Sequence, residues 1–150
     1  MNPSELNPTE DRALSMLLAG DDPVLDALRR QVKEVVVAKR ETSTAGFFTE
    51  FYLTAGQLLL KSGKKDFQIS DVNAESNGLV CGFTLLVRAG ALSSLQCHLR
   101  GHGELTSNTT FIRWYYIQQA KPDSPQLSES SVRDLGTERK KWADNTNPSR

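Results

Sequence analysis

The sequence predicts an α+β fold in which an N-terminal helical hairpin packs on one face of an antiparallel sheet of about six strands. Two helix-start signals lie close together near the N-terminus, and strand-type patterns dominate from residue 35 to residue 117. The segment 79–99 alternates so regularly between apolar and polar residues that the register of a hairpin can be derived. Helices followed by a run of strands are typical of α+β domains.

Both helix starts carry capping signals. In Asn7-Pro8-Thr9-Glu10, the asparagine can cap, proline suits the first helical position and glutamate falls at the third. Gly20 is placed to end this helix, and Asp22-Pro23 repeats the start signal for a second helix that reaches about Val32. The short turn between them predicts a helical hairpin. Its apolar stripes are Ala13, Leu14, Leu17 and Leu18, then Val24, Leu25, Leu28 and Val32.

The hairpin at 79–99 is predicted to have a three-residue loop, Arg88-Ala89-Gly90, with glycine in the left-handed position. This register places Phe83 opposite Leu95 and Cys81 opposite Cys97. A two-residue loop would instead place Phe83 opposite Gln96, so the hydrophobic match favours the first register. One face is then core, and the other carries polar residues, namely Thr84, Arg88, Ser94, Gln96, His98 and Arg100.

The domain is predicted to cover residues 1–120, with residues 121–150 forming a mostly disordered polar tail. Four further strands are indicated, at 35–38, 47–53, 67–72 and 111–117. Beyond Ala120 the composition shifts to Pro, Ser and charged residues, which bury too little apolar area to offset ordering. Trp142 is the one large apolar group there. It could anchor the tail in a partner's groove, although a mobile-tail residue is the favoured interpretation.

Composition excludes several classes of partner. Eighteen basic and eighteen acidic residues give zero net charge, which argues against binding to nucleic acid or to an anionic membrane. No stretch approaches the roughly 18 apolar residues of a membrane span. The N-terminus lacks a signal-peptide pattern, so a cytoplasmic location is expected. Cys81 and Cys97 could form a disulfide, but two reduced core thiols are favoured.

No catalytic residue, metal site or cofactor is expected from the sequence. His98 and His102 are spaced as metal ligands on a helix, and Glu104 could add a third, but they span a strand end and a glycine turn. Cys97 should point away from His98, which disfavours a nucleophile pair. No glycine-rich phosphate loop follows a strand. These patterns favour a non-enzymatic protein.

Protein binding is the function that we expect, through the polar sheet face and the exit of the hairpin. The candidate partner-binding residues are Glu50, Gln96, His98, Arg100, His102 and Glu104. A patch of roughly 800 Å² per partner would suffice for a tight complex. The alternative is a small-molecule-binding or enzymatic domain with an apolar pocket on the concave sheet face, lined by Phe51, Tyr52, Trp114 and Tyr116. An oligomer formed through a sheet edge is a third possibility.

Three segments carry a resemblance to a group of small uncharacterised bacterial proteins. They are residues 17–31 (LLAGDDPVLDALRRQ), 44–51 (TAGFFTEF) and 78–90, which ends GFTLLVRAG. The resemblance covers about residues 13–117 and implies a stand-alone cytosolic domain without an established activity. The chain departs from the group's pattern at Ala45 and after Leu95. Together with the polar sheet face, this suggests an immunity protein that neutralises a bacterial toxin encoded nearby.

Overall fold

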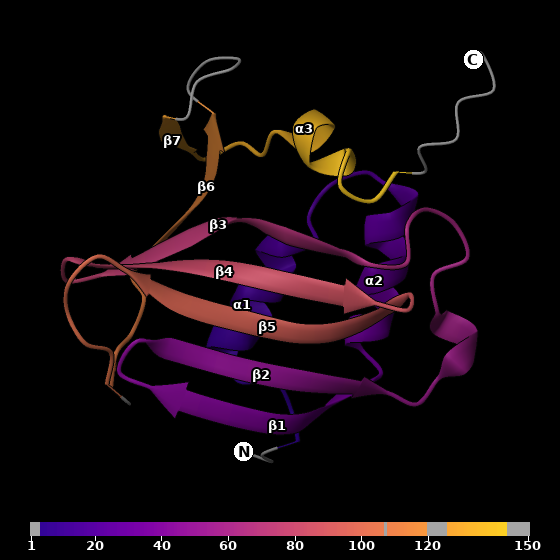
Figure 1. The fold of residues 1–150 in the computed structure, drawn as a ribbon, viewed down its shortest axis with the longest axis horizontal. Coiled ribbons are helices and arrows are strands. Elements are labelled where there is room, and N and C mark those ends of the chain that lie inside the picture. Colours follow the sequence, from indigo (N-terminus) through magenta and orange to yellow (C-terminus); the bar gives the residue numbers. More distant parts are fainter. Residues whose placement is uncertain (1–3, 107, 120–125, 144–150) are drawn as a thin grey trace.

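The computed structural model describes residues 4–106, 108–119 and 126–143, and within them a seven-stranded antiparallel sheet is backed by two helices (Figure 1). The strand order is β1-β2-β5-β4-β3-β6-β7, so the predicted α+β class is confirmed. In chain order the elements are α1 (Pro8–Leu17), α2 (Pro23–Val32), β1 (Val35–Ser43), β2 (Gly46–Leu53), the single-turn helix η1 (Gly56–Leu58), β3 (Phe67–Ser76), β4 (Leu79–Arg88), β5 (Ala91–Arg100), β6 (Arg113–Gln119), β7 (Leu127–Ser130) and α3 (Leu135–Arg139).

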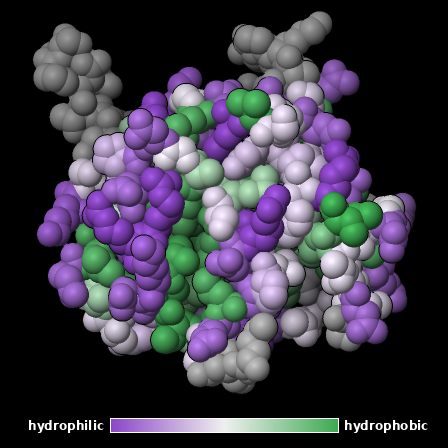
Figure 2. All heavy atoms as spheres, turned by 180° about the vertical axis from the view of Figure 1, so that it is seen from behind, coloured by the Kyte–Doolittle hydropathy of each residue, from purple (hydrophilic) through white to green (hydrophobic). Residues whose placement is uncertain are grey.

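The two N-terminal helices begin at the caps that the sequence indicates. The Asn7 side chain accepts from the Glu10 N–H at 2.8 Å, and the Glu10 carboxylate accepts from the Asn7 N–H at 2.8 Å. Asp22 caps α2 by accepting from the N–H of Val24 at 2.8 Å. Both helices lie behind the sheet in Figure 1 and bury their apolar stripes against it. Seen from the helix side, hydrophobic side chains show as a narrow strip between hydrophilic ones (Figure 2).

The register predicted for the hairpin of β4 and β5 is wrong by two residues up to Leu86, although the faces of β4 are assigned correctly. Ala89 and Gly90 both have positive φ, 52° and 79°, so they form a two-residue turn rather than part of a three-residue loop. An irregularity between Leu86 and Val87 then restores the match of apolar faces. Phe83 therefore lies opposite Cys97. Because side chains alternate with a period of two, this shift leaves Ser94 to Arg100 on their predicted faces, whereas the irregularity puts Leu92, rather than Ala91 and Ser93, on the core face.

The two cysteines are not opposite each other, which corrects a second detail of that prediction. Cys81 lies opposite Leu99, and Cys97 is its diagonal neighbour on the adjacent strand. Both are buried free thiols on the inner face of the sheet. They pack in the core with Phe83, Leu85 and the helix residues. Among the described residues, no helix is both long and apolar enough to cross a membrane.

The C-terminal segment 126–143 is folded against the body, so the prediction of a mostly disordered tail is wrong for these residues. Trp142 is 1% exposed, and its ring centroid lies 5.8 Å from that of Phe67. Arg133 makes two hydrogen bonds to Asp71, each of 2.9 Å. One buried indole and one buried ion pair thus hold a segment whose composition alone suggests disorder. The rest of the predicted tail, 121–125 and 144–150, lies outside the described residues.

Candidate functional site

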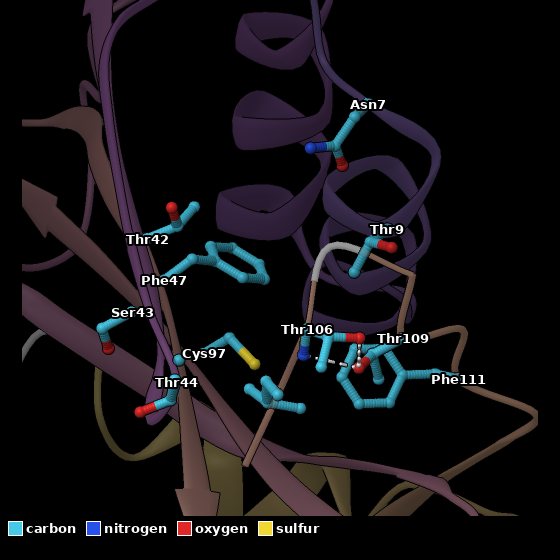
Figure 3. Close-up of a pocket in the computed structure, with 12 residues that line it drawn as sticks. Asn7, Thr9, Thr42, Ser43, Thr44, Phe47, Cys97, Thr106, Thr109 and Phe111 are labelled. Atoms are coloured by element: carbon cyan, nitrogen blue, oxygen red, sulfur yellow. Dashed lines mark hydrogen bonds between the residues drawn. The ribbon is translucent and has the colours of Figure 1, made fainter.

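A cavity of about 410 Å³ opens at one end of the inner sheet face. It lies between the start of α1, the β1–β2 hairpin and the loop that follows β5 (Figure 3). Its lining combines three parts of the chain that are distant in sequence: Asn7 and Thr9; Thr42, Ser43, Thr44, Gly46 and Phe47; and Cys97, Leu105, Thr106, Thr109 and Phe111.

Gly46 makes this end of the sheet possible. A Cβ at this position would lie 1.8 Å from the carbonyl oxygen of Cys97, so only glycine allows β2 to approach β5 here. The next residue, Phe47, then projects to the inner face. Its ring centroid lies 6.2 Å from that of Phe83, and the Phe111 centroid lies 5.7 Å from Phe83 on another side. The inner wall of the cavity is therefore aromatic.

The lining divides into an apolar wall and a polar rim. Phe47, Cys97, Leu105 and Phe111 form the wall, and the hydroxyl and amide side chains form the rim. The Thr106 N–H donates to the Thr109 hydroxyl oxygen at 2.9 Å, which fixes the loop side of the rim (Figure 3). No acidic, basic or histidine side chain is among the described residues that line the cavity. The site can thus hold an apolar body and offer it neutral hydrogen-bonding groups.

The thiol of Cys97 points toward the cavity (Figure 3). Its hydrogen bond to Cys81 and its burial both raise its pKa. The same hydrogen bond lowers the pKa of Cys81, against the effect of burial. Because Cys97 is the partner that lines the cavity, the group presented there is a neutral thiol. A neutral thiol is a weak nucleophile, so the sulfur contributes polarizable contact surface rather than chemistry.

A buried ion pair beside the cavity holds two of its walls together. Glu10 of α1 is fully buried and accepts from Arg40 Nε at 2.8 Å, from Arg40 Nη2 at 2.7 Å and from the Thr49 hydroxyl at 2.6 Å. Burial raises the pKa of Glu10, but the hydrogen bonds from Arg40, Thr49 and the Asn7 N–H outweigh it and leave the pKa below 4.5. The start of α1 is thereby fixed to β1 and β2.

Four of the six predicted partner-binding residues share the outer face of the sheet. Glu50 lies opposite Ser94 across β2 and β5, and Gln96, His98 and Arg100 alternate along β5 on the same side. This face is turned to the viewer in Figure 1, and neither α1 nor α2 covers it. Burial and the nearby Arg100 charge lower the pKa of His98.

The other two predicted residues, His102 and Glu104, lie in the exposed loop beyond β5. They follow the end of the strand and so do not continue its row of side chains. Among the described residues, no group of three or more His, Cys, Asp or Glu side chains is arranged to hold a metal ion. The structure therefore places the six candidates in two separate regions.

The four aromatic residues predicted to line one pocket lie on two different faces of the sheet. Phe51, Trp114 and Tyr116 lie on the inner face, where Phe51 is 7% and Tyr116 is 8% exposed. Tyr52 lies on the opposite face and is 59% exposed. Strand alternation separates neighbouring aromatics in this way. The observed cavity was missed because its rim is built from threonines that the sequence shows as ordinary loop and strand residues.

Comparisons of the chain with protein-family models, with curated proteins and with solved structures gave no match. The resemblance to a bacterial protein group therefore stays a prediction, and the function has to be inferred from the geometry of the sites.

Proposed function

We propose that this protein is a non-enzymatic binding protein that holds a small, uncharged molecule with an apolar body in the inner-face cavity. The observation that carries this proposal is the cavity itself, with a volume of about 410 Å³ and no charged side chain among the described residues that line it. Cavities of roughly 300–1,000 Å³ that combine apolar walls with a few polar groups are typical of small-molecule sites.

The uncharged lining supports a neutral ligand. A charged ligand would lose its hydration on entering and would find no opposite charge among the described lining residues. The hydroxyls of Thr9, Thr42 and Thr109 can each donate or accept one hydrogen bond, so they suit a ligand with a hydroxyl or carbonyl group at the rim. Phe47 and Phe111 offer aromatic surface to the rest of the ligand.

The same lining favours binding over catalysis. General acid–base chemistry requires a titratable side chain within hydrogen-bond reach of the ligand. Cys97 is the titratable group in the described lining, and its hydrogen bond to Cys81 and its burial keep it protonated. The described part of the lining offers the threonine hydroxyls no neighbouring base to activate them.

A matched pair of fluorescent probes tests the proposal. Phenylnaphthylamine is neutral, and anilinonaphthalene sulfonate has the same rings with one negative charge. We expect saturable binding of the neutral probe at one site, with affinity at least about tenfold higher than that of the sulfonate. Equal affinities, or no saturable binding of the neutral probe, would overturn the proposal.

Two substitutions locate the probe. Thr9→Phe introduces a ring from α1 into the rim and should abolish binding of the neutral probe. Thr84→Phe makes the same change on β4, on the outer face of the sheet, and should leave binding unchanged. Binding that survives Thr9→Phe would place the probe elsewhere and contradict the assignment.

A second candidate function is protein binding through the outer sheet face, and it is favoured by the position of Glu50, Gln96, His98 and Arg100 on one uncovered surface. We propose as its partner a toxin encoded by a neighbouring gene, which this protein would neutralise in the cytoplasm.

Co-purification with the product of a neighbouring gene tests this second function. The double variant Gln96→Ala, His98→Ala should lose the complex, and Asp11→Ala on the helix side should retain it. Failure to co-purify with any neighbouring product contradicts this function.

A further inference from the structure

A second hollow, of about 260 Å³, opens on the outer face of the sheet and is lined by residues of β3, β5, β6 and β7. Asn73, Arg100 and Tyr115 form its polar side, and Ile117 and Leu127 form an apolar side. It lies on the opposite face of the sheet from the cavity with Phe47 and Cys97. The two sites therefore have separate linings and separate chemistry.

The guanidinium of Arg100 rests on the backbone of Gly82. A Cβ built on Gly82 would lie 2.5 Å from Nη2, 2.6 Å from Nε and 2.8 Å from Cζ of Arg100. The φ of Gly82 is not in the left-handed region, so what distinguishes glycine here is the close approach that it allows to the guanidinium. Among the described residues, Arg100 has no hydrogen-bond or ion-pair partner. Its donors are therefore available to a ligand.

Asn73 supplies a buried acceptor next to this guanidinium. Asn73 is 6% exposed and lies opposite Gly82 in the sheet, and its Oδ1 has no hydrogen-bond partner among the described residues. Its amide hydrogen-bonds to the Tyr115 hydroxyl, which itself donates to Glu75 at 2.8 Å. Because the hydroxyl hydrogen is used on Glu75, the Asn73 amide must be the donor to Tyr115. One of the two Nδ2 hydrogens is thus used on Tyr115, and no described residue donates to Oδ1.

A ligand that hydrogen-bonds to both the Arg100 guanidinium and Asn73 Oδ1 needs two acceptor atoms next to one donor. A planar guanidinium binds a carboxylate through two parallel hydrogen bonds, and Oδ1 of Asn73 requires an N–H or O–H. Ile117 and the half-exposed Leu127 offer surface for an apolar side chain. Glu129 also lines the hollow; its carboxylate accepts from Arg113 at 2.8 Å, and Arg113 pairs with Glu75 as well.

We propose that this hollow binds the carboxylate of an apolar α-amino acid residue, with the carboxylate on Arg100 and the adjacent N–H on Asn73. A free amino acid and the C-terminal residue of a polypeptide share this chemistry. The proposal is independent of the neutral-ligand cavity, and neither site needs the other to be occupied.

Amide NMR titrations with three related probes test the site and distinguish the two sources. Leucine represents the free amino acid, N-acetyl-leucine represents a polypeptide C-terminus, and leucinamide has the same side chain without a carboxylate. We expect saturable shifts at Asn73 and Gly82 with one or both acids, and binding of leucinamide at least about tenfold weaker. Stronger binding of leucine identifies a free amino acid, and stronger binding of N-acetyl-leucine identifies a C-terminus. Equal binding of leucinamide, or no shift with either acid, would overturn the proposal.

Substitutions on the same face supply the controls. Arg100→Gln should weaken binding of the preferred acid by at least about tenfold. Gly82→Ala keeps the arginine but displaces its guanidinium, and the added methyl meets only the end of that flexible side chain, so the fold is retained. It should also weaken binding. Arg88→Gln removes another exposed arginine from β4 and should have no effect. Unchanged affinity in Arg100→Gln contradicts the site.

Discussion

Trp142 donates a hydrogen bond from its indole Nε1 to Oδ1 of Asp22 at 3.1 Å, across 120 residues of chain. The same carboxylate caps α2 and accepts from Arg139 Nε at 2.7 Å. One aspartate therefore begins a helix and also holds the C-terminal segment. The start of α2, the strand β3 that carries Phe67, and the segment after α3 are joined at this point.

Trp142→Ala should strongly destabilise the protein. The indole is 1% exposed, and its removal leaves a cavity beside Phe67 and an acceptor on Asp22 without its donor. We expect the free energy of unfolding in urea to fall by about 3–5 kcal/mol. Val132→Ala is the control, since Val132 is 72% exposed, and it should change stability by less than about 0.5 kcal/mol. Equal effects of the two substitutions would show that the indole is not part of the core.

Acid should unfold the protein through carboxylates that are stabilised in the folded state. Burial raises the pKa of Asp22, but hydrogen bonds from Arg139 and from the N–H groups of Leu25 and Val24 leave it below 3.8. A depressed pKa stabilises the fold above the unfolded-state value and loses that contribution as pH falls through the folded value. We expect the free energy of unfolding to decline below about pH 4.

Asp22→Asn isolates this contribution. The variant should be less stable at neutral pH and should show a shallower decline in acid, measured by urea unfolding at several pH values. Burial raises the pKa of Glu138, which acts with the opposite sign because its protonated form is favoured in the folded state. An unchanged acid slope in Asp22→Asn would contradict the assignment to Asp22.

Glu10→Gln should cost more stability than the same change at an exposed ion pair. Glu10 is fully buried, and its loss of charge leaves Arg40, 25% exposed, without its carboxylate. Breaking such a pair costs about 3 kcal/mol. Glu41→Gln removes the partner of Lys39 on the surface, where the side chains are 59% and 60% exposed, and should cost less than about 1 kcal/mol. Thermal and urea unfolding of both variants would compare them, and similar losses would refute the role of Glu10.

Gly46→Ala should prevent the close pairing of β2 with β5. Its Cβ would lie 1.8 Å from the Cys97 carbonyl oxygen, where backbone rather than a flexible side chain must move. We expect a loss of at least about 3 kcal/mol in the free energy of unfolding. At Gly56 an added Cβ meets no atom within 4 Å, so Gly56→Ala should be nearly neutral. A mild effect at Gly46 would mean that the strand end can shift apart.

The local signals in this sequence predict local structure well. Asn7 and Asp22 cap helices because the capping residue and the first turn are neighbours in the chain. The faces of the β4 residues and of Ser94 to Arg100 on β5 also follow from alternation alone. The pairing between those strands does not, because the irregularity after Leu86 adds a residue that an apolar pattern with a period of two cannot reveal.

The candidate sites were less accessible to prediction because each depends on contacts between distant segments. The cavity joins Thr9, Phe47 and Thr109, which no local pattern connects. The outer-face position of His98 and Arg100 could be predicted, since it needs only strand alternation. The contact between the Arg100 guanidinium and Gly82 could not be predicted, because it depends on the conformation of a long side chain.

The bond between Trp142 and Asp22 also sets the order in which the molecule can be completed during synthesis. A nascent chain that has left the ribosome only as far as β5 already has both N-terminal helices and the central strands. In such a chain the ring of Phe67 is still exposed, since Trp142, which packs against it in the complete protein, has not yet been synthesised. Closing so long a loop carries an entropic cost that local hairpins avoid. Incomplete chains therefore expose apolar surface around Phe67 until the segment that carries Trp142 packs against it.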